Sequence, residues 1–419
     1  MKKLKALGMI SGIGSMLIGA KLQEYEIVGN IEWRKYYHTG TFEKNFPGAF
    51  LEKTLNDLSP EQREQCQDLD LIIGHTECGN FSNMRANKIN RIDEGDKGDI
   101  PEFLEAVQEF KPKFFVMDNL PKSLLVADWQ YYFEELPDYE IHFEWVNNYG
   151  YGNIQKNRKR LFVIGVKRGL GFYFIPGEFK HSVSVIERLS EIDEDAENNE
   201  KLDIDAIYNG WSRYQFDASC IGKTVDENRM TLREFQSRIA DYPNNLNFPY
   251  YNKKGEQKFK IGFSKINVEG SALVLSGGGA CYDNHFRSDT LFPFTIRERA
   301  KIQGCPDDFV FLPTGVTSTT REYSHLIKQT GKFMPIEFCT FITLQIKNFL
   351  EDVREDDDYT QARLINPNNL VDQNKWEFCS TMGYTAQEKV CQFCGSKKYC
   401  EARKMEEIKK QIFKNDDLY

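Results

Sequence analysis

The chain has 419 residues and a mass of 48.8 kDa, enough for two or three structural units with at least one large core. Its net charge of -9 and pI of about 5.4 argue against a protein coated with nucleic-acid contacts, although a local basic face is compatible with them. Its 31 Phe and 20 Tyr residues supply ample core material.

The N-terminal residues 1–20 combine basic residues with an apolar run, as secretory signal peptides do. Ser and Gly interrupt this run, and the segment after it has the composition of the second half of a βαβ unit, so we expect no signal peptide. Because no stretch of about 18 apolar residues occurs elsewhere, we also expect no membrane contact and a cytoplasmic location. The ten cysteines are too sparse for a small disulfide-rich domain and fit a reducing compartment.

Short apolar runs alternate with helix-length segments, which predicts an α/β fold with a doubly wound sheet. The expected strands cover residues 4–10, 26–31, 69–74, 114–118, 140–146 and 160–166. One expected helix directly follows the first strand. Three more cover residues 101–110, 295–303 and 334–351, and the helix at 101–110 begins with Pro101. Residues 187–205 are acidic and polar, and 206–290 are irregular in composition.

A glycine-containing turn, Ser11-Gly12-Ile13-Gly14, follows the first expected strand and opens a helix. Glycines in such a turn let backbone N–H groups approach a ligand. Glu32 lies 20 residues beyond Gly12, where a carboxylate commonly binds ribose hydroxyls. The pattern suggests a nucleoside-bearing cofactor, although many such turns bind no ligand.

Polar residues also follow the third and fourth expected strands, at the end where open α/β sheets place their sites. Cys78 lies in the loop after the third strand, where it is either a nucleophile or a buried structural thiol. We interpret His75 as a loop residue rather than a ligand. Asp118 and Asn119 close the fourth strand and either bind the edge of a heterocycle or form a turn before a proline.

A basic cluster precedes the last expected strand of this region, and it is either a solvated face or a phosphate clamp. It consists of Lys156, Arg158, Lys159 and Arg160.

The order and spacing of these segments resemble the DNA (cytosine-5) methyltransferases. SGIGSMLIGAKL and the IEW that contains Trp33 are similar to the first two motifs of that family, and GHTECGNFS resembles its nucleophile motif. VMDNLP and NIQKNRKRLFVIG resemble the next two. FPFTIRERAKIQGCPDDF is the most specific match, and STTREYSHLIKQTGKFMP resembles the final motif.

The resemblance implies a Rossmann-like fold that binds S-adenosylmethionine and acts on double-stranded DNA within a restriction–modification system or a phage-infected cell. It implies a catalytic domain at 1–168 that is completed by 291–352, and a target recognition region at 169–290. The implied cofactor residues are Ile10, Ser11, Gly12, Gly14, Glu32 and Trp33. The implied catalytic residues are Cys78, Asp118, Asn119, Arg158 and Arg160.

In the implied reaction the thiolate of Cys78 attacks C6 of a flipped-out cytosine and activates C5 for methyl transfer. Several residues depart from the family pattern. Glu77 replaces a proline, Gly79 a glutamine and Asp118 a glutamate, and Gln155 lies three residues before Arg158 instead of two. The alternatives are therefore a homologue that binds DNA or a partner without methylating it, and an enzyme with an altered donor or pyrimidine substrate.

The C-terminal extension, residues 353–419, holds a cluster of cysteines. Cys391, Cys394 and Cys400 have a fourth candidate ligand upstream in Cys379. Four thiolates at such spacing predict a structural metal centre, either zinc or an iron–sulfur cluster. The alternative is a set of reduced thiols.

Overall fold

The computed structural model describes most of the predicted α/β region and part of the remainder. The described residues are 3–33, 39–76, 99–121, 123, 132, 134–156, 158–172, 174, 180, 182–193, 195–199, 240–241, 243–244, 250–251, 257–259, 264–275, 285–314, 319–334 and 336–355.

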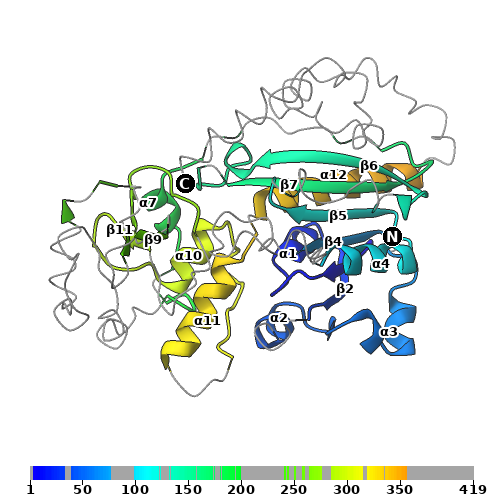
Figure 1. Cartoon of the computed structure of the whole chain (residues 1–419), viewed down its shortest axis with the longest axis horizontal. Coiled ribbons are helices and arrows are strands. Elements are labelled where there is room, and N and C mark those ends of the chain that lie inside the picture. Colours follow the sequence, from blue (N-terminus) through cyan, green and yellow to red (C-terminus); the bar gives the residue numbers. More distant parts are fainter. Residues whose placement is uncertain are drawn as a thin grey trace, which may run out of the picture.

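The described residues form a seven-stranded sheet in the order β3-β2-β1-β4-β5-β7-β6 (Figure 1). The strands are β1 (Lys5–Met9), β2 (Glu26–Ile31), β3 (Phe50–Glu52), β4 (Leu71–His75), β5 (Phe114–Asn119), β6 (Tyr139–Asn147) and β7 (Lys159–Lys167). This order confirms the predicted doubly wound sheet, and six of the seven strands lie within two residues of their predicted bounds. The additional strand, β3, has three residues, too few to show a pattern.

Strand direction gathers the ends of five parallel strands at one edge of the sheet. β3, β2, β1, β4 and β5 are parallel, so their carboxyl ends share this edge. β7 runs antiparallel to β5, with Asn119 opposite Leu161, so β7 begins where β5 ends. The predicted site residues on β5 and near the start of β7 therefore meet at the carboxyl edge.

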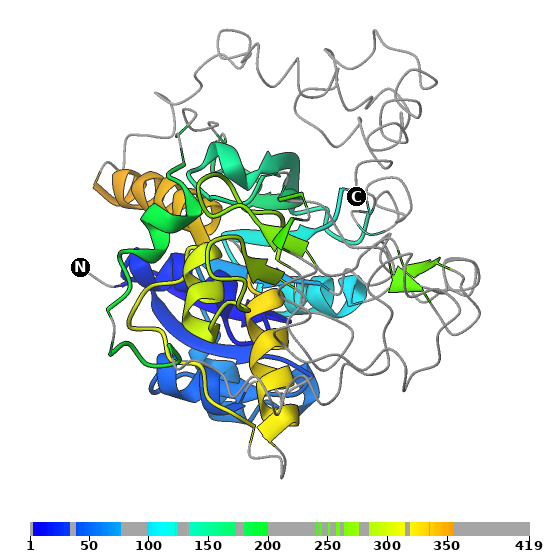
Figure 2. The same ribbon diagram turned by 90° about the vertical axis from the view of Figure 1, so that its left-hand side faces the viewer.

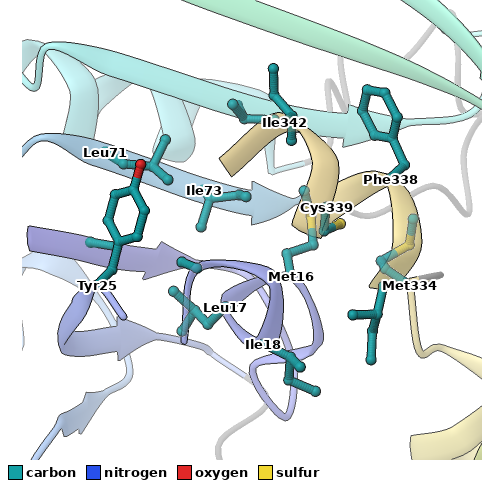
Figure 3. Close-up of a cluster of buried hydrophobic side chains, with 14 of the residues drawn as sticks. Met16, Leu17, Ile18, Tyr25, Leu71, Ile73, Met334, Phe338, Cys339 and Ile342 are labelled. Atoms are coloured by element: carbon teal, nitrogen blue, oxygen red, sulfur yellow. The ribbon is translucent and has the colours of Figure 1, made fainter. Parts of the chain in front are cut away.

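One face of the sheet is covered by α1 (Ser15–Leu22) and α12 (Ile336–Glu355). Figure 3 shows Met16, Leu17 and Ile18 of α1 beside Phe338 and Cys339 of α12. The two helices approach closely because α1 carries Gly19, where an added Cβ would lie 2.6 Å from the backbone carbon of Cys339. Any side chain at this position would push the two helices apart.

The opposite face is covered by α4 (Ile100–Phe110), which packs with a second apolar cluster. α3 (Pro60–Gln65) buries no residue of its own, but Leu58 before it and Cys66 after it belong to this cluster. Ser59 starts α3 with a capping box in which its side chain accepts from Gln62 N. α4 has a proline in its first turn and buries Phe103, Leu104 and Val107 on one stripe. Both faces of the sheet are thus buried, as its continuous apolar strands require.

Beyond the sheet, a second group of elements lies beside its carboxyl edge (Figures 1 and 2). It contains α7 (Val185–Leu189), β10 (Ser264–Ile266), β11 (His285–Arg287), α10 (Ile296–Ile302) and α11 (Thr319–Gly331). Apolar residues of α7, β10 and α10 form a third core cluster with Ile154 from the segment after β6. α2 (Thr39–Asn45), the two-residue strand β8 (Tyr250–Tyr251), β9 (Gln257–Phe259) and the short helices η2 (Leu55–Asp57) and η3 (Asn148–Gly150) complete the described elements.

The helices predicted at 295–303 and 334–351 correspond to α10 and α12. The predicted division into a catalytic domain, a target recognition region and a C-terminal extension stays a prediction. None of the helices in the described ranges is both long and apolar enough to cross a lipid bilayer.

Candidate functional site at the carboxyl edge of the sheet

The turn after β1 is held in place by side chains from the end of β2. Gly12 N donates to Glu32 Oε2 at 2.8 Å, and Asn30 Nδ2 donates to Gly12 O at 3.1 Å. Ser11 Oγ donates to Asn30 Oδ1 at 2.9 Å. Ser11, Asn30 and Glu32 are all buried. The predicted cofactor turn is therefore rigid and presents its backbone beside a buried carboxylate.

Ile10 and Gly14 of this turn have positive φ angles, which few residues adopt. Gly14 precedes α1 with φ of 85°, and an added Cβ would lie 2.5 Å from the Phe46 ring. Ile10 also has positive φ, at 55°, which strains a β-branched residue. Its N–H donates to Ile31 O at 2.7 Å, which holds the strained residue in place. Trp33, two residues after β2, is exposed.

Asp118, near the end of β5, is fully buried, and the side chains of His75 and Arg160 lie next to its carboxyl group. His75 Nδ1 lies 2.5 Å from Asp118 Oδ2, and Arg160 Nη1 lies 3.9 Å from the same oxygen. Within the described residues, neither Asp118 Oδ1 nor Arg160 Nη1 has a hydrogen-bond partner. A buried carboxyl oxygen and a buried N–H group thus face the carboxyl edge without partners, and buried polar atoms of this kind are rare in native proteins.

Asn119 links the ends of β4 and β5. Its Nδ2 donates to Thr76 Oγ1 at 2.7 Å, and its Oδ1 accepts from Leu120 N at 2.7 Å. Thr76 and Asn119 are completely buried. Asn119 therefore fixes the chain that leaves both strands.

The guanidinium of Arg158 binds main-chain carbonyls. Nη2 donates to Phe333 O at 2.8 Å, and Nη1 donates to Leu275 O at 3.3 Å. These contacts join the start of β7 to two segments more than 100 residues away in the chain. Arg158 and Arg160, predicted together, therefore have different surroundings.

Like Arg158, Gln155 links the sheet to segments that follow much later in the chain. Its Nε2 donates to Gln303 Oε1 at 2.8 Å, and its Oε1 accepts from Leu275 N at 2.8 Å. Gln155, which lies one residue farther from Arg158 than the family spacing gives, is therefore fully buried and connects the sheet to α10.

Five predicted site residues fall outside the described residues. They are Cys78, Cys379, Cys391, Cys394 and Cys400. Within the described ranges, no group of three or more His, Cys, Asp or Glu side chains is arranged to hold a metal ion. Because the four C-terminal cysteines lie outside those ranges, their metal centre stays a prediction.

The described cysteines are buried in the core. Cys66, Cys305 and Cys339 are free thiols, and burial raises the pKa of each. For Cys66 the pKa rises to about 12. A thiol with a raised pKa forms little thiolate, so these three residues are poor nucleophiles.

Three residues of this edge were not predicted to take part in the site. His75 was interpreted as a loop residue, but it is the last residue of β4 and contacts Asp118. Asn30 and Thr76 support the predicted residues by side-chain hydrogen bonds. The available signal was position alone, because all three lie at or next to the carboxyl end of an apolar strand.

Comparison with known families matches residues 4–348 to the model for C-5 cytosine-specific DNA methylases. The match spans the whole sheet together with α10, α11 and the first 13 of the 20 residues of α12. It therefore includes every described residue of the candidate site.

Individual proteins give similar results. A type II methyltransferase of Neisseria gonorrhoeae, M.NgoFVII, is 26% identical over 78% of this chain and 84% of its own length. M.FnuDI of Fusobacterium nucleatum, also a type II methyltransferase, is 23% identical over 83% of this chain and 96% of its own length. A prophage-encoded E. coli protein described as a DNA modification methyltransferase superposes with a TM-score of 0.56 at 20% identity, and the match covers 83% of this chain and all of that structure.

Proposed function

This chain belongs to the C-5 cytosine-specific DNA methylases, and we propose that it transfers a methyl group from S-adenosylmethionine to C5 of a flipped-out cytosine in double-stranded DNA. The observation that carries this proposal is the pair of partnerless buried atoms at the carboxyl edge, Asp118 Oδ1 and Arg160 Nη1. An acid and a cationic donor side by side match the N3 and O2 atoms along one edge of cytosine.

In the proposed reaction the thiolate of Cys78 forms a bond to C6 of the cytosine. Asp118 gives a proton from Oδ1 to N3 as this bond forms, and Arg160 donates a hydrogen bond to O2. Both contacts stabilise the electron-rich ring, which makes C5 nucleophilic. C5 then takes the methyl group of the donor, and its own proton passes to water. The sulfur of Cys78 leaves C6 as a thiolate and the N3 proton returns to Asp118, which restores the aromatic base.

The turn after β1 fits the cofactor in its chemistry. S-adenosylmethionine supplies the methyl group when bound. We propose that Glu32 accepts hydrogen bonds from its ribose, that Trp33 and Ile10 pack on its adenine, and that the Gly12 and Gly14 backbone lies along its amino-acid portion. The rigid hydrogen bonds of Ser11, Asn30 and Glu32 support this assignment, because they fix the turn in advance of binding.

We propose that residues 169–290 recognise the DNA sequence. β10 and β11 belong to this region and lie beside the carboxyl edge, where Ile266 of β10 packs in one cluster with Ile154 from the segment after β6. Arg158 and Gln155 act in this proposal as links that hold the region against the sheet, rather than as groups that touch the base.

Covalent trapping tests the proposal. Fluorine at C5 blocks the elimination step, so a duplex that contains 5-fluorocytosine should form a covalent complex with the enzyme in the presence of S-adenosylmethionine. The duplex should be a pool of mixed sequences, so that it includes the DNA sequence that the enzyme recognises. Formation of a denaturation-resistant complex supports the proposed nucleophile, base and donor together.

Two variants serve as controls. Cys78→Ser should form no complex while it still binds S-adenosylmethionine in calorimetry. Asp118→Asn should form the complex at least tenfold more slowly, since general acid catalysis contributes roughly 10²- to 10⁴-fold. A wild-type protein that binds the cofactor but forms no complex and methylates no cytosine would overturn the proposal.

A further inference from the structure

His75 and Asp118 are direct neighbours on two parallel strands. The register of β4 and β5 pairs His75 with Asp118, so their side chains leave the same face of the sheet. Nδ1 of the imidazole lies 2.5 Å from Oδ2 of the carboxyl group. The side chain of Asp118 is completely buried, and that of His75 is 17% exposed. The contact is therefore a short hydrogen bond shielded from water.

The two oxygens of Asp118 have different surroundings. Oδ2 faces His75 Nδ1 and, at 3.9 Å, Arg160 Nη1. Oδ1 has no partner among the described residues. A carboxyl group held at one oxygen by a hydrogen bond keeps a fixed orientation and presents its second oxygen in one direction.

We infer that His75 is a positioning residue for the reaction, which orients the Asp118 carboxyl group and stabilises the carboxylate that forms when Asp118 gives its proton to the base. The inference rests on the proposed function and extends it to a residue that the sequence alone indicates only as a loop residue. Asp118 is one methylene shorter than the glutamate usual at this position, and the histidine on the neighbouring strand supplies the support that a shorter acid needs.

The proton balance of this step is simple. The Oδ1 proton of Asp118 moves to N3 of the cytosine, and the carboxyl group becomes a carboxylate. His75 keeps its Nδ1 proton and donates it to Oδ2 throughout, and this hydrogen bond strengthens when Oδ2 becomes charged. When the product base leaves, the N3 proton returns to Oδ1, so the pair is regenerated without another reactant.

The other groups that face the pair do not replace His75. Arg160 approaches Oδ2 only to 3.9 Å, beyond hydrogen-bond distance. Cys339 of α12 lies near Asp118, but burial and the charge of Asp118 raise the pKa of its thiol. A neutral thiol is a weak donor, so the imidazole is the principal support of this carboxyl group among the described residues.

The decisive experiment compares two substitutions at one position. His75→Phe keeps a planar ring but removes the donor, whereas His75→Asn keeps an N–H donor close to the position of Nδ1. We expect His75→Phe to lower kcat for cytosine methylation by roughly tenfold to hundredfold with KM for DNA and for S-adenosylmethionine nearly unchanged. His75→Asn should retain kcat within about threefold of wild type, since its amide restores the hydrogen bond.

A double-mutant cycle shows whether His75 acts through Asp118. In the Asp118→Asn background, His75→Phe should cause little further loss of kcat, because the group that it positions is already inactive. Equal kcat in wild type and His75→Phe would overturn the inference. Equal losses in His75→Phe and His75→Asn, or full additivity with Asp118→Asn, would also overturn it.

A spectroscopic measurement separates this inference from the proposed function. In protein labelled with ¹⁵N-histidine, a short hydrogen bond should give a far-downfield Nδ1 proton signal that His75→Phe abolishes and Asp118→Asn shifts. Absence of this signal in wild type overturns the pairing, whatever the activity. A protein that shows the signal but methylates no cytosine overturns the proposed function and not the pairing.

Discussion

Gln155 donates a hydrogen bond from Nε2 to Oε1 of Gln303 at 2.8 Å, and this contact joins the segment after β6 to the end of α10. Gln303 Nε2 in turn donates to Thr330 O at 3.2 Å, and Gln155 Oε1 accepts from Leu275 N. Both glutamines are completely buried. A single chain of hydrogen bonds therefore connects the sheet with three segments that follow it by more than 100 residues.

Breaking this chain should destabilise the fold. Gln155→Leu leaves Gln303 Oε1 and Leu275 N without partners in a buried site, and each buried unsatisfied group costs about 1–3 kcal/mol. We expect the free energy of unfolding in urea to fall by roughly 2–4 kcal/mol. Gln155 has no role in the proposed cofactor site, so any remaining folded enzyme should keep its affinity for S-adenosylmethionine.

The control is the exposed pair Lys347 and Glu24, whose side chains lie 3.2 Å apart at the surface. Lys347→Leu should change the free energy of unfolding by no more than about 1 kcal/mol, because exposed ion pairs contribute little. Equal effects of Gln155→Leu and Lys347→Leu would contradict a stabilising role for the buried chain.

The sheet was predictable from the sequence because its central strands are buried on both faces. Such strands appear as continuous apolar runs, as in LDLIIG and FFVMD, and their length and flanking residues set their bounds within two residues. β3 was missed because three residues show no pattern. α11 was missed because its apolar residues are few, and its sequence TTREYSHLIKQTG is polar on average.

The candidate site was predictable only where motif and strand end coincide, as for Glu32 and Asp118. The contact between His75 and Asp118 depends on the register of two strands separated by 38 residues of intervening chain, and a sequence does not display register. The different surroundings of Arg158 and Arg160 depend on which distant carbonyls approach β7. Tertiary contacts of this kind have no local signal.

The two arginines at the start of β7 should respond differently to substitution. Arg158→Met leaves the carbonyl oxygens of Leu275 and Phe333 without their donor, and we expect a loss of about 3 kcal/mol in the free energy of unfolding. Arg160→Met removes a guanidinium whose Nη1 has no hydrogen-bond partner among the described residues and lies 3.9 Å from Asp118 Oδ2, so stability should change by less than about 1 kcal/mol.

Activity should show the opposite order. Arg160→Met should lower kcat by roughly 10²-fold or more, because its donor stabilises charge on the base. Arg158→Met, assayed at a temperature at which circular dichroism shows it folded, should keep most of its kcat. Urea unfolding and initial rates of tritiated methyl transfer measure the two properties separately. A loss of kcat confined to Arg158→Met would reverse our assignment of the two residues.

Cofactor binding should depend on Glu32, whose Oε2 accepts from Gly12 N at 2.8 Å. Glu32→Ala removes both this support and the proposed ribose contact. We expect the Kd for S-adenosylmethionine, measured by calorimetry, to rise by roughly tenfold to hundredfold, which is about 1.4–2.8 kcal/mol. Glu24→Gln removes the same charge at an exposed position and should leave Kd within twofold. An unchanged Kd in Glu32→Ala would place the cofactor elsewhere.

His285 should make the stability of the fold depend on pH. Nδ1 of this fully buried side chain lies 2.8 Å from Ser264 Oγ, across the pair of β10 and β11. Burial, and then the charge of Arg299, lower the pKa of His285 from 6.5 to about 3. The folded protein therefore keeps this imidazole neutral, whereas the unfolded chain binds a proton as the pH falls below about 6.5.

The sign of the effect follows from the number of bound protons. Above pH 6.5 the imidazole is neutral in both states and contributes no pH dependence. Between about pH 6.5 and 3 the unfolded chain binds one more proton at this position, so the free energy of unfolding falls by about 1.4 kcal/mol for each pH unit. His285→Asn cannot titrate, and its stability should therefore fall less steeply than that of wild type over this interval.

Urea unfolding at half-unit steps from pH 7.5 to 4.5 measures the two slopes. Other groups titrate in the same interval, such as Glu337, whose pKa burial raises, and for this reason the difference between wild type and His285→Asn is the quantity that counts. At pH 4.5 this difference should reach about 2–3 kcal/mol relative to its value at pH 7.5. Ser264→Ala is the matched control, because it removes the hydrogen bond but keeps the buried imidazole. Its stability should be lower at every pH with the slope of wild type, and parallel profiles for wild type and His285→Asn would show that His285 is not held neutral.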